Sequence, residues 1–276
     1  MTGATGVIGR ALMQRLRAEQ LPFFIYSREM FDLSDEVPLF SIVPAKPSAI
    51  IHLAAAVPKP PEIPDDDSNA VITRKLDRLI LKAAEQWDCH IVYASGCSLY
   101  KKNKAGTKIE EDTYNIVPQE SPYLTSKQKG EADFLKFGKV TVLRISAPIG
   151  EGLSKFTALG RFIKLAREDG CLEIWGSGTR EQNYVDVTDI ADAFIRTLIM
   201  RPTEIINIAH DEPITMLKLA NEVVRVFGRG SVCLTNKHDP HDGELARYSN
   251  LKAAELLGWR PVTDIKSSLE SIKRFL

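Results

Sequence analysis

Short apolar runs of strand length alternate with helical segments through the first half of this 276-residue chain. The runs at 22–27, 49–56, 91–95 and 140–146 are apolar along most of their length, not at every second residue. Strands of this kind are buried on both faces, as in a parallel sheet covered by helices. Helical spacing of apolar residues is found between them at 7–20 and 72–87, and residues 123–137 are also expected to be helical. The sequence therefore predicts an α/β fold with a Rossmann-type, doubly wound parallel sheet.

The second half of the chain has a different pattern. The chain is divided there into shorter pieces by Gly150, Gly152, Gly170, Gly176 and Gly178, and we expect a smaller mixed α/β C-terminal lobe. Our predicted division gives residues 1–146 to a dinucleotide-binding domain, with a return segment at about 184–205. Residues 147–183 and 206–276 are predicted to form a substrate-binding lobe. Helices are expected near 156–168, 189–200, 215–227, 249–257 and 264–276.

Composition argues against several classes of protein. Lys and Arg number 36, as do Asp and Glu, so the formal net charge is 0. A nucleic-acid partner is not expected, because no excess positive charge is available to replace phosphate counterions. No apolar run approaches the ~18 residues of a membrane span. The four cysteines are scattered without a C-x-x-C spacing and the histidines lack metal-ligand company, so we expect a cytoplasmic protein without a disulfide framework or a metal site.

Glycines at positions 3, 6 and 9 open the chain in the order T-G-A-T-G-V-I-G. Such glycines allow a tight turn, close backbone approach and close helix packing, and the following helix directs its free N–H groups at a diphosphate. A structural glycine turn is the alternative. The pattern directly precedes an amphipathic helix, which favours dinucleotide binding. The residues predicted to bind are Gly3, Thr5, Gly6, Val7, Ile8 and Gly9.

Tyr123 and Lys127 stand four residues apart in a predicted helix, so they share a face. An ammonium beside a phenol favours the phenolate, and we expect Lys127 to lower the pKa of Tyr123 toward a useful range for proton transfer. The same spacing also occurs on ordinary solvated helices. Ser95 and Ser98 lie at the end of the predicted strand 91–95, where their hydroxyls would polarise a substrate carbonyl or merely line a loop of small residues.

Several of these motifs together resemble the extended short-chain dehydrogenase/reductases, in particular the NAD-dependent epimerase/dehydratase group acting on nucleotide sugars. The similarity includes the T-G-A-T-G-V-I-G opening, H-L-A-A at 52–55, S-P-Y-L-T-S-K at 121–127, Y-V-D-V-T-D at 184–189 and L-L-G-W-R-P at 256–261. The resemblance implies that Tyr123 exchanges a proton with the sugar and that Lys127 holds the nicotinamide ribose. It also implies that Leu53, Ala54 and Ala55 border the cofactor, and that the protein is a homodimer.

The end of the second predicted strand bears on the choice of cofactor. Family members that prefer NAD usually carry an acid there, whereas this chain has Ser27 and Arg28. Arginine beside a hydroxyl suits a 2′-phosphate through charge-assisted bonds, so we expect NADP to bind more tightly than NAD. The stretch 27–35 is similar to that of the GDP-fucose synthase group, which implies that Asp32 and Leu33 border the adenine. Arg28 as a solvated surface residue is the alternative.

The chain also departs from the family pattern. Gly96 stands at the position of the usual catalytic hydroxyl, and Ser95 or Ser98 is the candidate replacement. Ala147 replaces a substrate-binding Asn of the family, and Gln182 replaces an Arg. Arg180 and Arg247 are therefore the candidate ligands of the substrate diphosphate. Ser98 is a further candidate for substrate binding. Only Met1 stands where the family has its first strand. We expect that strand to be missing from the chain as given, because the true start lies upstream or the chain is shortened, unless another segment fills the gap.

Two functions follow from these observations. The first is an enzyme that epimerises or reduces a nucleotide-activated sugar by hydride transfer. Dehydration is disfavoured, because the paired carboxylates that follow the catalytic hydroxyl in the dehydratases are absent. The second is a catalytically weak or inactive dinucleotide-binding sensor or scaffold, which Gly96 favours and the Tyr123–Lys127 pair disfavours.

Overall fold

A four-stranded parallel sheet forms the centre of the computed structural model, which describes residues 1–27, 43, 45–58, 63–100, 106–112 and 121–276. The strands lie in the order β1-β2-β3-β8. Their bounds are Ala49–His52, His90–Gly96, Val140–Ile145 and Ile205–Ile208. In the register, Ile51 lies beside Val92 and Val142 beside Ile205. The predicted α/β fold with a parallel sheet is therefore confirmed.

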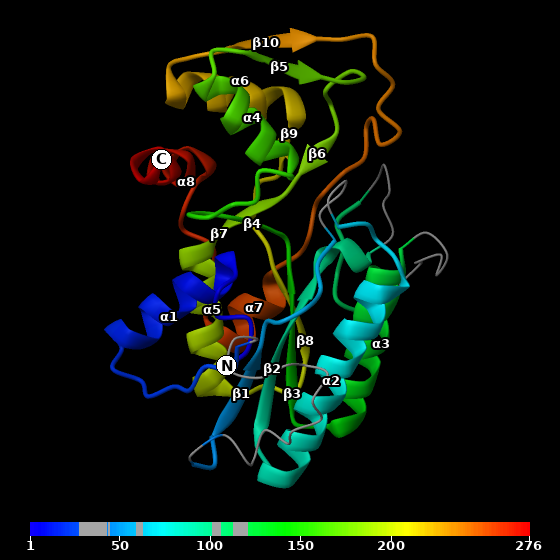
Figure 1. Ribbon diagram of the computed structural model, residues 1–276, viewed down its shortest axis with the longest axis vertical. Coiled ribbons are helices and arrows are strands. Elements are labelled where there is room, and N and C mark those ends of the chain that lie inside the picture. Colours follow the sequence, from blue (N-terminus) through cyan, green and yellow to red (C-terminus); the bar gives the residue numbers. More distant parts are fainter. Residues whose placement is uncertain (28–42, 44, 59–62, 101–105, 113–120) are drawn as a thin grey trace.

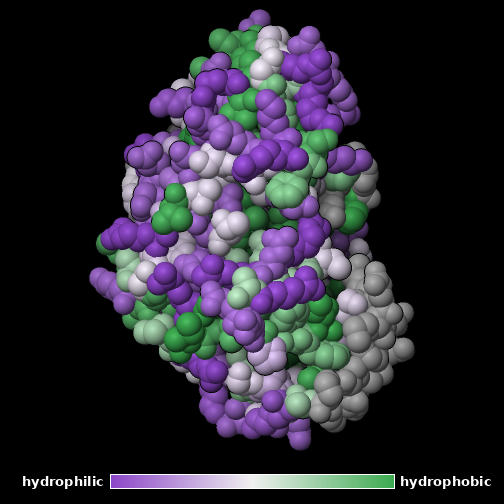
Figure 2. Space-filling view, turned by 90° about the vertical axis from the view of Figure 1, so that its left-hand side faces the viewer, coloured by the Kyte–Doolittle hydropathy of each residue, from purple (hydrophilic) through white to green (hydrophobic). Residues whose placement is uncertain are grey.

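Helices cover both faces of this sheet (Figure 1). One face carries α2 (Asp67–Trp87) and α3 (Pro122–Phe137), and the other carries α1 (Val7–Ala18), α5 (Val187–Met200) and α7 (Leu251–Leu257). Each face has its own apolar core, centred on Ile80, Tyr93 and Phe134 in one case and on Leu12 and Phe194 in the other. Hydrophilic residues dominate the surface on the α1 side (Figure 2). Because helices cover both faces of the sheet, the strand side chains are buried on both sides, which explains why the strands are apolar along most of their length.

The edge of the sheet beyond β1 differs from the prediction. The predicted strand 22–27 contributes only a bridge at Tyr26, and the predicted strand 49–56 ends at His52. Met1 and Thr2 lie between these segments: the amide of Tyr26 donates to the Met1 carbonyl at 2.8 Å, and the amide of Thr2 donates to the Ile51 carbonyl at 3.0 Å. Two residues therefore lie at the edge of the sheet where a strand was expected to be missing.

A second lobe stands above the carboxyl edge of the sheet (Figure 1). It contains α4 (Ala158–Arg167), α6 (Met216–Phe227) and α8 (Ile265–Phe275). Its short strands are β4 (Ala147–Ile149), β5 (Cys171–Ile174), β6 (Glu181–Gln182), β7 (Tyr184–Asp186), β9 (Ile214–Thr215) and β10 (Ser231–Leu234). One apolar core, which includes Leu159, Leu172 and Leu219, holds this lobe together.

Two elements expected in the second lobe lie with the first. Strand β8 pairs with β3, and α7 packs on the core around Phe194. The apolar side chains of Ile206, Ile208 and Leu257 explain this position, because they are buried only against that core. The cysteines also differ from expectation, since Cys171 and Cys233 are joined by a disulfide between β5 and β10.

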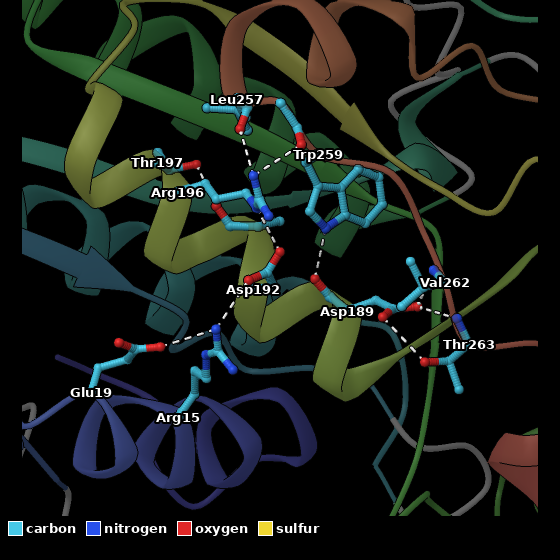
Figure 3. A network of polar contacts seen from close by, with 12 residues as sticks. Arg15, Glu19, Asp189, Asp192, Arg196, Thr197, Leu257, Trp259, Val262 and Thr263 are labelled. Atoms are coloured by element: carbon cyan, nitrogen blue, oxygen red, sulfur yellow. Dashed lines mark hydrogen bonds and ion pairs between the residues drawn. The ribbon is translucent and has the colours of Figure 1, made fainter.

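Asp189, in the first turn of α5, connects that helix to the closing segment of the chain (Figure 3). Its side chain accepts hydrogen bonds from the amides of Val262 and Thr263, and its carbonyl accepts one from the Trp259 indole at 2.9 Å. Two of the family landmarks, at 184–189 and 256–261, therefore contact each other and stabilise the fold.

The structure describes neither a membrane helix nor a metal centre. Among the described residues, no helix combines the length and hydrophobicity needed to cross a bilayer. Within the same part of the chain, no group of three or more His, Cys, Asp or Glu side chains is arranged to hold a metal ion.

Candidate active site

The glycine loop, residues 3–9, leads from Thr2 into α1. Gly3 has a φ of +69°, and a Cβ there would lie 2.8 Å from the backbone of Leu53 and Ala54. A Cβ on Gly9 would lie 2.2 Å from the Gly3 carbonyl oxygen. Both distances are too short for any side chain, so glycine is required at each position.

Gly6 is the N-cap of α1 and supplies no side chain to cap the helix. The amides of the first turn, at Val7, Ile8 and Gly9, therefore point to a position where an anion would complete their hydrogen bonding. Leu53, Ala54 and Ala55 are half-buried and lie beside this loop, directly after β1. Thr5 is exposed, and its carbonyl accepts a hydrogen bond from Arg10 at 2.7 Å. This backbone arrangement fits the diphosphate of a dinucleotide.

Helix α3 begins where the sequence predicted, and two side chains determine its start. Ser121 is the N-cap, with its hydroxyl oxygen accepting from the Leu124 amide at 3.1 Å. Asp65, two residues before α2, accepts a hydrogen bond from the Ser121 hydroxyl and another from the Tyr123 amide at 2.9 Å. The segment that follows β1 is thus attached directly to the residue proposed to transfer protons.

Lys127 is buried at the carboxyl end of β2. Its Nζ donates to the carbonyl of Ala94 at 2.7 Å and lies 3.9 Å from the centre of the Tyr93 ring. Burial lowers the pKa of Lys127 to about 8, although the negative charges of Asp77 and Glu131 act in the opposite direction.

The expected lowering of the Tyr123 pKa is wrong for this structure. Burial raises the pKa of Tyr123 to about 12, and the charges of Asp77 and Asp65 add to the increase. The Lys127 ammonium is hydrogen-bonded to the Ala94 carbonyl at the base of the site. The phenol is therefore protonated at neutral pH.

Ser95 and Ser98 occupy different environments around Gly96. The Ser95 hydroxyl is buried, with no hydrogen-bond partner among the described residues. Ser98 is exposed in the short 3₁₀ turn Cys97–Leu99, and its Oγ lies 3.0 Å from the position a Cβ on Gly96 would take. The Ser98 hydroxyl thus fills the space into which a side chain at 96 would point.

Arg180 and Arg247 lie on neighbouring segments of the second lobe and are both engaged by carboxylates. Arg180 pairs with Asp239 at 3.2 Å, and the half-exposed Arg247 pairs with Glu181 at 2.7 Å. A substrate diphosphate would have to compete with these partners. Ser27 is described and half-buried, whereas Arg28, Asp32 and Leu33 lie outside the described residues.

Sequence reasoning missed two acidic residues of this region, Asp65 and Asp77. Asp77 is fully buried on α2, on the same face as Thr73 and Ile80. An aspartate between apolar residues on the buried face of the helix was the available signal. Ile72, the first apolar residue of the helix predicted at 72–87, is 37% exposed and therefore does not lie on the buried face.

Comparison with known proteins bears on this arrangement. Residues 1–209 match the model of the NAD dependent epimerase/dehydratase family. The chain belongs to this family. It is 26% identical to a GDP-L-fucose synthase of Sinorhizobium fredii (strain NBRC 101917 / NGR234), over 98% of this chain and 92% of that protein. It is 25% identical to a dTDP-4-dehydro-6-deoxy-D-allose reductase of Streptomyces bikiniensis, over 100% of this chain and 94% of the relative.

Solved structures share the fold of this family member. MoeE5 in complex with UDP-glucuronic acid and NAD has a TM-score of 0.86 at 22% identity, with coverage of 100% of this chain and 98% of that one. RMD from Pseudomonas aeruginosa complexed with NADPH has a TM-score of 0.81 at 22% identity, with coverage of 98% and 95%. At this identity the likeness concerns the fold.

Proposed function

We propose that this chain is an enzyme that uses a nicotinamide dinucleotide to epimerise or reduce a sugar carried on a nucleotide. Family membership and the full-length similarity to sugar-nucleotide enzymes support this proposal. The observation that carries it is the position of Lys127, buried with its Nζ on the Ala94 carbonyl. This contact places the Tyr123–Lys127 face of α3 at the carboxyl edge of the sheet, where α/β proteins bind their ligands.

The residues divide the proposed work as follows. A bound nicotinamide dinucleotide supplies or accepts the hydride. The amides of the first turn of α1 bind the cofactor diphosphate. Leu53–Ala55 lie against the cofactor, and Lys127 holds the nicotinamide ribose. In the direction of reduction, Tyr123 donates its phenolic proton to the keto oxygen as that oxygen gains negative charge. Ser98 donates a second hydrogen bond to the same oxygen.

On the substrate side, we propose that Arg180 and Arg247 bind the sugar-nucleotide diphosphate. Arginine matches phosphate oxygens in a bidentate manner. Both arginines would exchange their present carboxylate partners, Asp239 and Glu181, for the substrate.

For the cofactor we propose NADP, on the basis of Ser27 and Arg28 in the sequence. Fluorescence titration is expected to give a lower dissociation constant for NADPH than for NADH, because the guanidinium adds a charge-assisted bond to the 2′-phosphate. Equal constants for the two cofactors would contradict the assignment.

We also propose a cytoplasmic homodimer. Exposed apolar side chains on α2, Val71 at 53% and Ile72 at 37%, support contact with a second copy through the α2–α3 face. Light scattering of the purified protein at micromolar concentration tests the stoichiometry, and a monomer at all concentrations would contradict it.

A second candidate is a dinucleotide-binding protein with little or no activity, which Gly96 and the engaged arginines favour. Tyr123→Phe separates the two. For an enzyme, the substitution abolishes turnover on nucleotide sugars and leaves NADPH binding intact, because only the proton donor is removed. If the unaltered protein binds NADPH but turns over none of a panel of UDP-, GDP- and dTDP-linked sugars, the second candidate is supported.

A further inference from the structure

A hydrogen-bonded chain of mostly buried groups runs from Ala54, beside the glycine loop, to Arg74 on α2. The Ala54 amide donates to Thr2 Oγ1 at 3.2 Å, and Thr2 Oγ1 lies 2.8 Å from His52 Nδ1. The other ring nitrogen, His52 Nε2, lies 3.1 Å from Asp77 Oδ1. The second carboxylate oxygen of Asp77 accepts from Arg74 at 2.9 Å. The side chains of His52 and Asp77 are 0% exposed.

The partners assign the direction of each hydrogen bond in this chain. Asp77 is paired with the Arg74 guanidinium, so its carboxylate accepts from both neighbours and His52 carries its proton on Nε2. Nδ1 then accepts from the Thr2 hydroxyl, whose oxygen in turn accepts from Ala54. A neutral His52 satisfies every group, and burial lowers the pKa of His52, which favours this neutral form.

Asp77 also lies close to the α3 side of the site. A Cβ added to Gly130 would come within 2.7 Å of Asp77 Oδ2 and 2.6 Å of Tyr93 Oη, so α3 approaches α2 closely at this point. The charge of Asp77 raises the pKa of both Tyr123 and Lys127. The charged and titratable groups that it contacts or acts on are His52 on β1, Arg74 on α2, Tyr93 on β2, and Tyr123 and Lys127 on α3. Two further carboxylates of α3 act on these groups: Asp133 bonds to Arg74, and Glu131 raises the pKa of Lys127.

We propose that Asp77 is a positioning residue that holds the His52–Thr2–Ala54 wall of the dinucleotide site and supplies a buried negative charge between α2 and the Lys127 side of α3. The inference rests on the proposed roles of Lys127 and Tyr123. Asp77 itself contacts neither the glycine loop nor the reacting sugar: it acts on the loop through His52 and Thr2, and on Lys127 through its negative charge. The carboxylate of Asp77 thus supports the residues beside the cofactor and also acts on the Tyr123–Lys127 pair through its charge.

Asp77→Asn tests this role without a change in size. His52 and Arg74 bond to different oxygens of Asp77, Oδ1 and Oδ2. In asparagine one of these atoms is an NH2 group, which donates and cannot accept, so one partner loses its acceptor, and the side chain carries no charge. Asp133→Asn is the matched control, because Asp133 also pairs with Arg74 but lies on the partly exposed side, at 38% exposure. Both variants lose an ion pair with Arg74. Only Asp77→Asn removes the negative charge that raises the pKa of Lys127.

The readout is the titration of Lys127 in the cofactor-free protein, followed by NMR of lysine labelled at Cε and assigned with Lys127→Met. The unaltered protein is expected to show a midpoint at about pH 8. Asp77→Asn moves it to lower pH by about one unit, because an opposite charge has been removed, and Asp133→Asn leaves it in place. Equal midpoints in the two aspartate variants would overturn the proposal.

A second variant covers the case in which Asp77→Asn does not fold. Arg74→Gln removes the cation that neutralises Asp77, so the Lys127 midpoint is expected to move to higher pH, the opposite direction. An unchanged or lower midpoint would overturn the proposal. Neither measurement uses turnover or added cofactor. Failure of the proposed enzymatic function, seen as absence of turnover, is therefore distinguishable from failure of this inference.

Discussion

At the scale of single residues, the most informative position is Gly96. The family places a hydroxyl there, and its absence made activity doubtful from the sequence. In the structure, Ser98 Oγ lies 3.0 Å from the point where a Cβ on residue 96 would be. A turn of three residues thus returns a hydroxyl to the same place, whereas the Ser95 hydroxyl is buried. We infer that Ser98 is the functional replacement and that Ser95 is not.

Ser98→Ala is expected to lower kcat about 10²- to 10³-fold, because one hydrogen-bond donor to the developing oxyanion is lost. Ser95→Ala is the control and is expected to change kcat little. Adding Gly96→Ser to Ser98→Ala should restore part of the activity, since the alanine leaves room for the new hydroxyl. Steady-state kinetics with an active sugar nucleotide measures all three. Full activity in the Ser95→Ala, Ser98→Ala double variant would contradict this assignment.

At the scale of elements, α3 is held at its start by Asp65 and in its middle by Glu131. Asp65 bonds the amide of Tyr123, from a segment 58 residues earlier in the chain. Glu131 makes two bonds to Arg144 of β3, at 3.2 and 3.0 Å, and both side chains are 1% exposed. Arg144 also donates to the hydroxyl of Tyr100, which ends the Ser95–Tyr100 turn. Helix α3 and the Ser98 turn therefore share one buried support.

Asp65→Ala is expected to lower kcat roughly 10- to 100-fold, because the first turn of α3 loses the contact that places Tyr123. The alkaline limit of the kcat profile should also move to lower pH, since the charge of Asp65 raises the pKa of Tyr123. Asp66→Ala is the matched control, because Asp66 caps α2 through the amides of Ser68 and Asn69 and does not contact α3. That variant should lose stability while the kcat profile keeps its shape.

Arg144→Met is expected to destabilise the fold by about 3–5 kcal/mol, because Glu131 would remain as a buried and unpaired charge. The double variant Arg144→Met, Glu131→Leu should recover much of that loss, since no charge then remains buried. Urea unfolding followed by circular dichroism measures the free energy of unfolding of each variant. A double variant less stable than both single variants would contradict this prediction, because the loss of stability would then not come from an unpaired buried charge.

At the scale of the whole molecule, the two faces of the sheet have separate cores and the second lobe has a third. The site lies where the carboxyl edge of the sheet meets the second lobe. Far from it, His90 begins β2, where its Nε2 lies 2.8 Å from the hydroxyl of Thr141. Burial lowers the pKa of His90 to about 4. A neutral histidine at the base of the sheet thus makes global stability depend on pH.

The unfolded chain takes up a proton at His90 near pH 6.5, whereas the folded protein does so only near pH 4. The stabilising effect of neutral His90 is therefore complete above about pH 6.5 and is lost as the pH falls toward 4, by about 2–3 kcal/mol. His90→Gln is expected to flatten this part of the curve of unfolding free energy against pH, measured with urea between pH 7 and 4. His238→Gln, at an exposed position, should leave the curve unchanged, and identical curves for both variants would contradict the prediction.

How much the sequence predicts depends on how local each feature is. The helix at 123–137 was predicted within one residue of its observed start, because helix formation depends on residues that are close in sequence. The glycine loop was recognisable for the same reason. The run at 22–27 was predicted as a strand but forms only a bridge to Thr2, because pairing there depends on a partner distant in sequence. The position of β8 in the main sheet also depends on a distant partner, β3.

The sequence by itself determined the class of fold, the glycine loop and the Tyr123–Lys127 spacing, because each depends on residues that are close together in the chain. Only the tertiary structure decided which groups surround that pair. Asp65, Asp77 and the Cys171–Cys233 disulfide, which spans 62 residues, all join segments distant in sequence. The direction of the Tyr123 pKa shift was also decided there, because desolvation and neighbouring charge depend on how the whole chain packs.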